Sequence, residues 1–407
     1  MPDVLPFPGV RYSDSAALAE LVCPPYDVIS PAEQDELHRR HPHNAVRLEL
    51  AKLEAGQAYA SARDAYESWL DQGVLQRDAE ATFYVYRQDF NGPDGQRRRV
   101  AGVIGALRLE PLGAGGVLPH ERTMPGPKRD RLALLEALPV NISPIYAIYR
   151  GGGRLRPLLD TLAERAPRGS FVDSSGIRHR LWPVTAAAEA SVLADALGAG
   201  PIVIADGHHR YETALSFAAK DPTHPGRSSI MTFLVDVDRE DLVVLPYHRI
   251  LKTPRGWQSL AESLQNTFPY TALAHEEIAG ALDASRADHP MVFVGSDRAV
   301  LIELSDAEVG AGLGTTAGAA RRLDVVVLHD LVIPAVVNGA MDDMSFTRDA
   351  AEVLSRARED EGTAGILMRA VDPVEVVDVA TSGERMPQKA SYFWPKALTG
   401  LVFHELR

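Results

Sequence analysis

The chain has 407 residues, 45% of them hydrophobic and 24% charged, which is typical of a folded globular protein and excludes a disordered one. The formal net charge of −13 argues against nucleic acid as the main partner, because phosphate backbones are bound by clustered Lys and Arg. The single cysteine, Cys23, excludes an intrachain disulfide and fits a reducing compartment.

No segment approaches the run of roughly 18 apolar residues that a membrane helix needs, and the opening residues do not resemble a signal peptide. We therefore expect a cytoplasmic protein with no membrane partner. At roughly 150 residues per domain, the length suggests about two or three domains, or one large domain with insertions. We place an N-terminal α/β region with a hairpin at 1–110, a core at 111–305 and a C-terminal region at 306–407.

The first region contains two clear local signals. Ser30 is followed by proline and, three residues on, by glutamate, which predicts a helix with a capping box at its start. Apolar residues at helical spacing predict a second helix from Ala51 to about Gly73. Strand-like segments at 82–86 and 100–109 flank an Asn-Gly-Pro-Asp-Gly turn, so a β-hairpin is expected there.

Helices and short strands alternate through the rest of the chain. Helices are expected at 129–138, 155–165 and 186–197, and strands at 145–149, 179–184, 201–205, 230–237, 242–245, 291–294 and 365–368. The Ala- and Gly-rich segment 308–320 is predicted to be a linker or a mobile loop. This alternation predicts a mixed α/β (α+β) protein.

The strongest functional signal is the sequence Ala-Asp-Gly-His-His-Arg at 205–210, where a predicted strand turns at glycine into a helix. The amide groups at a helix start and the helix dipole favour an anion there. Arg210 can bind a phosphate through two hydrogen bonds, and His208 and His209 can donate to it. Asp206 could hold Mg²⁺ or accept a proton from a substrate hydroxyl. The structural alternative is a capped helix with surface histidines.

A second cluster is His120, Glu121, Arg122 and Thr123, with Lys128 following. Glu121 lies between cationic neighbours in a loop stiffened by prolines, which is a setting that can hold a carboxylate for catalysis. A salt-bridged surface loop would contain the same residue types, so both interpretations stay open.

The tail from 383 to 396 places Lys389 and Lys396 among aromatic residues and prolines. Such a segment could close over a nucleotide base and its phosphates, or pack as an ordinary C-terminal clasp. Signatures of other nucleotide-binding and hydrolytic enzymes are absent from the sequence. It contains no GxxxxGK[ST], no protein-kinase HRD or DFG, and no GxSxG.

Four motifs together resemble a large bacterial family described as a domain of unknown function, whose members are similar to the SerK-type free serine kinases. The motifs are Cys-Pro-Pro-Tyr-Asp-Val-Ile-Ser at 23–30, His-Glu-Arg-Thr-Met-Pro-Gly-Pro-Lys at 120–128, Ala-Asp-Gly-His-His-Arg-Tyr-Glu-Thr-Ala-Leu at 205–215 and Met-Pro-Gln-Lys at 386–389. The resemblance covers about 24–401. It implies a ParB/sulfiredoxin-like core with additional N- and C-terminal α/β elements.

The same resemblance implies roles for particular residues. In that superfamily a Gly-x-His-Arg-type turn at a helix start binds nucleotide phosphates, and the matching residues here are Gly207, His208, His209 and Arg210. In the kinases an Asp beside this turn and a separate Glu serve catalysis. The resemblance assigns these roles to Asp206 and Glu121.

The resulting hypothesis is a Mg²⁺-dependent kinase that transfers a phosphoryl group from ATP or ADP to a free hydroxyl amino acid, with L-serine as the leading substrate. Asp206 is the metal ligand, and Asp206 or Glu121 takes the hydroxyl proton. Further phosphate contacts are assigned to Lys128, Lys389 and Lys396, and substrate contacts to His120, Arg122, Thr123 and Tyr211.

Two alternatives from other classes stay open at this point. One is a ParB-like regulator that binds a nucleotide without turnover, and the other is a metal-assisted phosphohydrolase that uses His208, His209 and Asp206. The expected partners are a nucleotide and a small hydroxyl amino acid, and the oligomeric state is left open.

Overall fold

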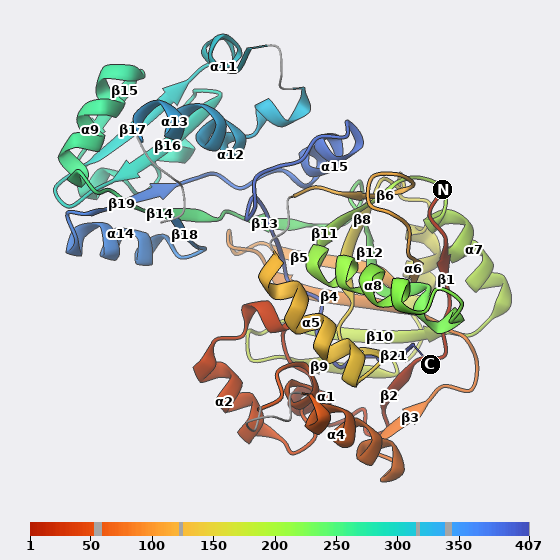
Figure 1. Cartoon of the computed structure of the whole chain (residues 1–407). Coiled ribbons are helices and arrows are strands. Elements are labelled where there is room, and N and C mark those ends of the chain that lie inside the picture. The colour runs from red at the N-terminus through yellow and green to blue at the C-terminus, as the bar shows by residue number, and fades with distance from the viewer. Residues whose placement is uncertain (53–58, 122–124, 315–317, 338–343, 407) are drawn as a thin grey trace. The chain divides into compact units, whose positions relative to one another are not determined.

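The computed structural model describes residues 1–52, 59–121, 125–314, 318–337 and 344–406, with the side chains of 125–127 left out. The chain forms two compact units (Figure 1). The first contains residues 1–119, 123–243 and 395–407, and the second contains 120–122 and 244–394. The boundaries between the two units lie near residues 119–123, 243 and 394, whereas the three regions proposed from the sequence meet at 110 and 305.

A nine-stranded mixed sheet forms the centre of the first unit. Its path runs β6, β11, β8, β12, β5, β4, β10, β9, and β1 pairs with β5. The bounds are β1 Val4–Leu5, β4 Phe83–Asn91, β5 Arg97–Arg108, β6 Val117–Pro119, β8 Ile145–Tyr149, β9 Gly169–Val172, β10 Arg178–Val184, β11 Ile202–Asp206 and β12 Ser229–Asp236. The β6–β11 and β8–β12 pairs are parallel and the others are antiparallel.

The strands of this sheet are buried because they are rich in Val, Ile, Leu and aromatic residues. Leucines of α6 (Arg156–Ala163) and α7 (Ala187–Leu197) pack into the same core. Helices α5 (Pro125–Ala137) and α8 (His208–Lys220) pack together through Leu135 and Phe217, which also contact Leu406. The predicted hairpin is confirmed as β4 and β5, with Tyr84 opposite Ile104.

The N-terminal part of the first unit consists of short helices and a two-stranded ribbon. Its elements are β2 Val10–Tyr12, α1 Leu18–Leu21, α2 Pro31–Arg40, α3 Val46–Glu49, α4 Ala60–Asp71 and β3 Leu75–Arg77. The predicted helix start at Ser30 is confirmed, since its hydroxyl accepts a hydrogen bond from the Glu33 amide at 3.2 Å. The helix expected over 51–73 is shorter, because α4 begins at Ala60; residues 53–58 lie outside the described ones.

The end of the chain returns to the first unit. Strand β21 (His404–Glu405) pairs with β7 (Val140–Asn141), and Thr399 and Phe403 form β-bridges with Cys23 and Val10. Backbone pairing therefore holds the segment 399–405 at three places: at Cys23, at Val10 and at β7. This return brings Lys396 into the first unit, whereas Lys389 belongs to the second.

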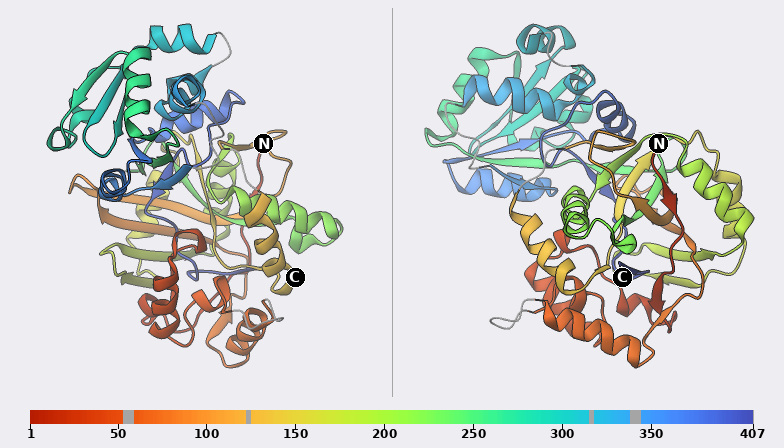
Figure 2. Two further views of the ribbon diagram at one scale, coloured as in Figure 1. Left: turned by 60° about the vertical axis from the view of Figure 1, so that its left-hand side comes forward. Right: turned by 45° about the vertical axis from the view of Figure 1, so that its right-hand side comes forward.

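The second unit is built on a six-stranded antiparallel sheet in the order β15, β17, β16, β19, β14, β18. The views in Figure 2 show helices next to this sheet. Its strands are β14 His248–Lys252, β15 Tyr270–Leu273, β16 His289–Val294, β17 Ala299–Leu304, β18 Met344–Thr347 and β19 Thr363–Leu367, with β13 Val243–Leu245 and β20 Tyr392–Trp394 outside the sheet. Its helices are α9 Gly256–Thr267, α10 Ala281–Ala284, α11 Asp306–Leu313, α12 Asp324–Val327, α13 Ile333–Val336, α14 Ala350–Glu359 and α15 Pro373–Thr381.

The segment 308–320 differs from its prediction. Much of it belongs to α11, whose N-terminus is closed by a capping box in which Ser305 and Glu308 exchange hydrogen bonds. The Glu308 carboxylate accepts from the Ser305 amide at 2.8 Å, which satisfies a backbone group that would otherwise lack a partner. The interpretation as a loop was wrong because alanine favours a helix once the helix start is capped. Residues 315–317 lie outside the described ones.

The mixed α/β fold predicted from the sequence is confirmed by the two sheets and the helices around them. In the first unit parallel and antiparallel pairs occur in one sheet, and in the second all pairs of the main sheet are antiparallel. Within the described part of the chain, no helix combines the length and the apolar character needed to cross a bilayer.

Candidate functional site

The Asp206 carboxylate stands at the end of a buried strand of the first unit. The register between β11 and β8 shifts between Ile204 and Asp206, which marks an irregularity of the kind that redirects a side chain at a strand end. Gly207 follows with φ +95°, and a Cβ there would lie 2.7 Å from Cγ2 of Ile145. Only glycine adopts this positive φ without strain and avoids the clash with Ile145. The sequence of this turn therefore strongly specifies the predicted strand-turn-helix.

Two cations face this carboxylate, one at each oxygen. Arg210 Nη2 donates to Oδ2 of Asp206 at 2.8 Å, and Lys396 Nζ contacts Oδ1. The side chains of Arg210, Asp206 and Lys396 are 11%, 15% and 8% exposed. We call these three residues the Asp206 cluster. Gln88 on β4 donates to the Lys396 carbonyl at 2.9 Å and so fixes the backbone that presents the lysine.

The charges of the Asp206 cluster determine its protonation. Burial raises the pKa of Asp206, but Lys396 and Arg210 outweigh it and hold that pKa at about 2. Burial alone would lower the pKa of Arg210, yet the neighbouring Asp206 carboxylate raises it. The Asp206 carboxylate and the Arg210 guanidinium are therefore both charged at neutral pH, and the Lys396 amino group lies against the same carboxylate.

The predicted Mg²⁺ ligand requires a separate test. Both oxygens of Asp206 already face cations, so this arrangement does not fit metal ligation by its carboxylate. Among the described residues, no three His, Cys, Asp or Glu side chains are grouped to hold a metal ion. The described side chains thus form no dedicated metal site around Asp206.

A chain of polar contacts extends from Arg210 into the interior of the first unit. Arg210 Nη1 donates to Ser143 Oγ at 3.1 Å and to the Pro144 carbonyl at 2.7 Å. Ser143 Oγ in turn donates to Oε1 of Glu49 at 3.4 Å, and Arg131 Nη1 lies 3.7 Å from the same oxygen. Burial raises the pKa of Glu49, although Arg131 and Arg210 act to lower it.

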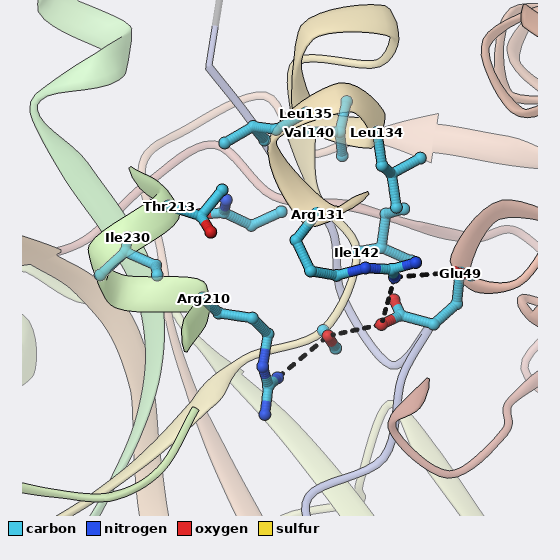
Figure 3. A pocket seen from close by; sticks show the side chains of 11 residues that line it. Glu49, Arg131, Leu134, Leu135, Val140, Ile142, Arg210, Thr213 and Ile230 are labelled. Atoms are coloured by element: carbon cyan, nitrogen blue, oxygen red, sulfur yellow. Dashed lines mark hydrogen bonds and ion pairs between the residues drawn. The ribbon is translucent and has the colours of Figure 1, made fainter. Parts of the chain in front are cut away.

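These residues line a small, partly open pocket (Figure 3). Its wall combines the polar residues above, with Asn141 and Thr213, and a set of apolar side chains: Leu134, Leu135, Val140, Ile142 and Ile230. In the figure Arg131 contacts Glu49 directly, whereas Arg210 is linked to Glu49 through the Ser143 hydroxyl. Sequence reasoning missed Glu49 and Ser143, since neither belongs to a motif and they meet Arg210 only in the folded chain.

The other residues of the first unit that were predicted to contact phosphate or substrate lie outside the Asp206 cluster. Lys128 Nζ forms an ion pair with Glu212, one helix turn from His208. His208 is buried at the first turn of α8, and His209 beside it is partly exposed. Tyr211 is fully buried; its hydroxyl donates to the Glu110 carbonyl at 2.9 Å and accepts from the amide of the same residue. This arrangement gives Tyr211 a packing role.

The second unit brings together two motifs that are far apart in the sequence. The Met386 amide donates to the His120 carbonyl at 2.8 Å, and His120 Nε2 lies 3.0 Å from Ser391 Oγ. The Lys389 amide donates to Oε2 of Glu121 at 3.2 Å. We call these five residues the Glu121 cluster. Arg122 and Thr123, predicted as substrate contacts, lie outside the described residues.

The predicted site residues therefore occur in two groups. Asp206 and Arg210 gather with Lys396 in the first unit, and Glu121 gathers with Lys389 in the second. The C-terminal segment that contains both lysines contributes one to each group. Sequence order alone could not divide them, because only seven positions separate 389 from 396.

Comparison with known proteins gives one family and several solved structures. The model of a family described as "Protein of unknown function (DUF1015)" matches residues 4–326. No curated protein matches the chain significantly.

The solved structures are distant. A C-terminally truncated SbnI from Staphylococcus aureus is 11% identical with a TM-score of 0.40, over 73% of this chain and 85% of its own. A free serine kinase in complex with AMP is 11% identical with a TM-score of 0.36; the match covers 70% of this chain and 92% of the kinase chain. A variant free serine kinase in complex with ADP is 11% identical with a TM-score of 0.36; the match covers 68% of this chain and 84% of the kinase chain.

Proposed function

The chain belongs to the DUF1015 family, and we propose that it is a kinase that transfers a phosphoryl group from a nucleotide to the hydroxyl group of a free amino acid. The observation that carries the proposal is the Asp206 cluster, a buried carboxylate between two cations at the start of a 13-residue helix. L-Serine is the first substrate to test, because the four motifs of the chain resemble a family whose members are similar to the SerK-type free serine kinases.

The Asp206 cluster has the charge that a phosphate group needs. Arg210 and Lys396 supply two positive charges against one negative, and the start of α8 adds roughly half an elementary charge. Phosphoryl transfer depends mainly on positioning and on neutralising charge, with little covalent chemistry for the protein. A terminal phosphate bound by Lys396 and the first turn of α8 would meet both needs.

The same phosphate would change the basicity of Asp206. The two cations keep its pKa at about 2, whereas burial acts in the opposite direction. When a phosphate draws Lys396 away, burial raises the pKa of Asp206 and makes its carboxylate a better base. The substrate hydroxyl oxygen then bonds to the terminal phosphorus, the bond from that phosphorus to the leaving nucleotide breaks, and the hydroxyl proton passes to Asp206. Glu121 is the second candidate for this proton.

The test is a phosphorus NMR assay of the purified protein with Mg²⁺, L-serine, and ATP or ADP. We expect a phosphoserine resonance from the wild type and at least about a hundredfold slower formation with Asp206→Asn. The matched control is Asp195→Asn, an exposed aspartate on α7, which should retain the wild-type rate. A thermal melt of each variant verifies that it is folded at the assay temperature.

Glu121→Gln distinguishes the two candidate bases in the same assay. If Asp206 takes the proton, Glu121→Gln keeps more activity than Asp206→Asn, and the reverse order assigns the proton to Glu121. Wild-type activity in Asp206→Asn would contradict the role of the Asp206 cluster. Tight nucleotide binding without any product would replace the kinase by a nucleotide-binding regulator, and phosphate release from phosphoserine would indicate a phosphohydrolase.

A further inference from the structure

Arg249 is the largest fully buried side chain in the described part of the protein. It lies on β14, between β19 and the edge strand β18 of the second unit's sheet, where it is opposite Phe346 on β18 and Ile366 on β19. Its residue exposure is 1%. An arginine at such a position is unusual, because charged side chains are almost never fully buried unless they are paired.

The partners of Arg249 are neutral. It donates from Nη1 to the Tyr247 carbonyl and from Nη2 to the Lys389 carbonyl at 3.2 Å, and its Cζ lies 5.5 Å from the centre of the Phe346 ring. No carboxylate among the described residues forms an ion pair with it, and within that set its Nε lacks a hydrogen-bond partner. Burial lowers the pKa of Arg249 to about 10. Such a group adds little stability, because an apolar side chain would avoid the cost of burying the charge.

One of these partners, Lys389, has an unusual backbone. Its φ is +57°, in the left-handed region that non-glycine residues rarely adopt. Arg249 holds the Lys389 carbonyl on one side, and on the other the Lys389 amide donates to Oε2 of Glu121 at 3.2 Å. The left-handed residue therefore connects the buried arginine directly to the carboxylate of the second predicted motif.

The rest of the Glu121 cluster depends on the same short segment. Met386, three residues before Lys389, donates to the His120 carbonyl, and Ser391, two residues after it, contacts the His120 ring. Arg249 donates a charge-assisted hydrogen bond to Lys389, the residue of this segment whose backbone is strained. Strained backbone of this kind persists only where neighbouring groups hold it, and it concentrates at functional sites.

We infer that Arg249 is a positioning residue: by holding the carbonyl of Lys389 it keeps the left-handed turn in place, and through the amide of that turn it orients the carboxylate of Glu121. The inference rests on the proposed function only where it assigns Glu121 to phosphoryl transfer. The contact chain itself, from Arg249 through Lys389 to Glu121, is independent of the reaction.

The first test does not involve activity. Hydrogen exchange of the segment 386–391 is measured by mass spectrometry in the wild type and in Arg249→Met. We expect exchange of this segment to be about tenfold faster or more in the variant, with the paired strands β16 and β17 unchanged as an internal reference. The matched control is Arg356→Met, an exposed arginine on α14 whose Nε lies 3.7 Å from Glu352; its exchange should equal that of the wild type.

Thermal melting separates positioning from a purely structural role. Arg249→Met removes a costly buried charge as well as two hydrogen bonds, so we expect a melting temperature within about 4 °C of the wild type. A much lower melting temperature with faster exchange throughout the second unit would mean that Arg249 serves stability, which would overturn the inference. Unchanged exchange at 386–391 would overturn it as well.

The second test uses the phosphoserine assay. We expect Arg249→Met to lower kcat by about tenfold, and by no more than Glu121→Gln does, with KM for the nucleotide changed less than about threefold, because the residue acts on Glu121 and not on the phosphates. Arg249→Lys retains a positive charge and a donor, and should recover part of kcat. If the wild type forms no phosphoserine, the proposed function fails, whereas the exchange experiment still decides the inference about Arg249.

Discussion

Two buried arginines of this protein are held in different ways. Arg210 in the first unit lies against the Asp206 carboxylate, which raises the pKa of its guanidinium despite burial. Arg249 in the second unit has only carbonyl and ring partners among the described residues, and burial lowers its pKa to about 10. The comparison teaches that burial alone does not determine what a charged side chain contributes. A paired charge supports both stability and chemistry, whereas a charge held by carbonyls mainly orients them.

The largest effect should come from breaking the pairing in the Asp206 cluster. Asp206→Asn leaves Lys396 and Arg210 buried without their anion, and we expect it to lower the free energy of unfolding by about 3 kcal/mol. Lys396→Met leaves the Asp206–Arg210 pair intact and should cost less. In the double variant Asp206→Asn/Lys396→Met, the two losses in the free energy of unfolding should not add. Urea unfolding should give a coupling energy of about 2 kcal/mol between the two positions. Simple additivity would show that Lys396 is not energetically paired with Asp206.

Acid titration makes the comparison quantitative. The folded-state pKa of Asp206 is about 2, below its ordinary value of 3.8, so its ionised form stabilises the fold above about pH 4. This contribution, about 2 kcal/mol, is lost as the pH falls from about 4 to about 2. In urea unfolding between pH 5 and pH 2, Asp206→Asn should lose that part of the pH dependence.

Arg249→Met serves as the contrast in the same titration. Its guanidinium stays protonated throughout acid conditions, so the variant should keep the pH dependence of the wild type. If the free energy of unfolding of Asp206→Asn depended on pH as that of the wild type does, the acid-sensitive stability would not come from the Asp206 cluster.

The smallest of the three effects concerns the link from Arg210 to the interior. Ser143→Ala removes the hydroxyl that accepts from Arg210 and donates to Glu49, and should lower the free energy of unfolding by about 1 kcal/mol. The control is Ser191→Ala, an exposed serine on α7, which should change it by less than about 0.5 kcal/mol. Equal effects of the two variants would show that the Ser143 hydroxyl does not connect the two charged groups.

Much of the secondary structure could be predicted because its signals are local. The cap at Ser30, the hairpin of β4 and β5 and the turn at Gly207 each depend on residues a few positions apart. The helix α11 differs from the prediction: the Ala and Gly content of the segment is typical of a loop, whereas the capping box of Ser305 and Glu308 starts a helix.

The candidate site was predicted in part. Asp206 and Arg210 are neighbours on one strand-turn-helix, so their contact follows from local geometry. Glu49 and Ser143 could not be found in this way, because they approach Arg210 from separate elements and belong to no recognised motif. Arg249 could not be found either, because it belongs to none of the four motifs and its burial depends on the pairing of β14 with β18 and β19.

The sequence by itself determined the strand-turn-helix of Asp206, the motifs that contain Glu121 and Lys389, and the mixed α/β class, since each follows from spacing within a short segment. Only the tertiary structure decided that the end of the chain returns to the first unit and brings Lys396 to Asp206. It also decided that Lys389 is held between Arg249 and Glu121. The physical reason is that such contacts join segments over a hundred positions apart, and their geometry is determined by sheet pairing and burial rather than by local propensity.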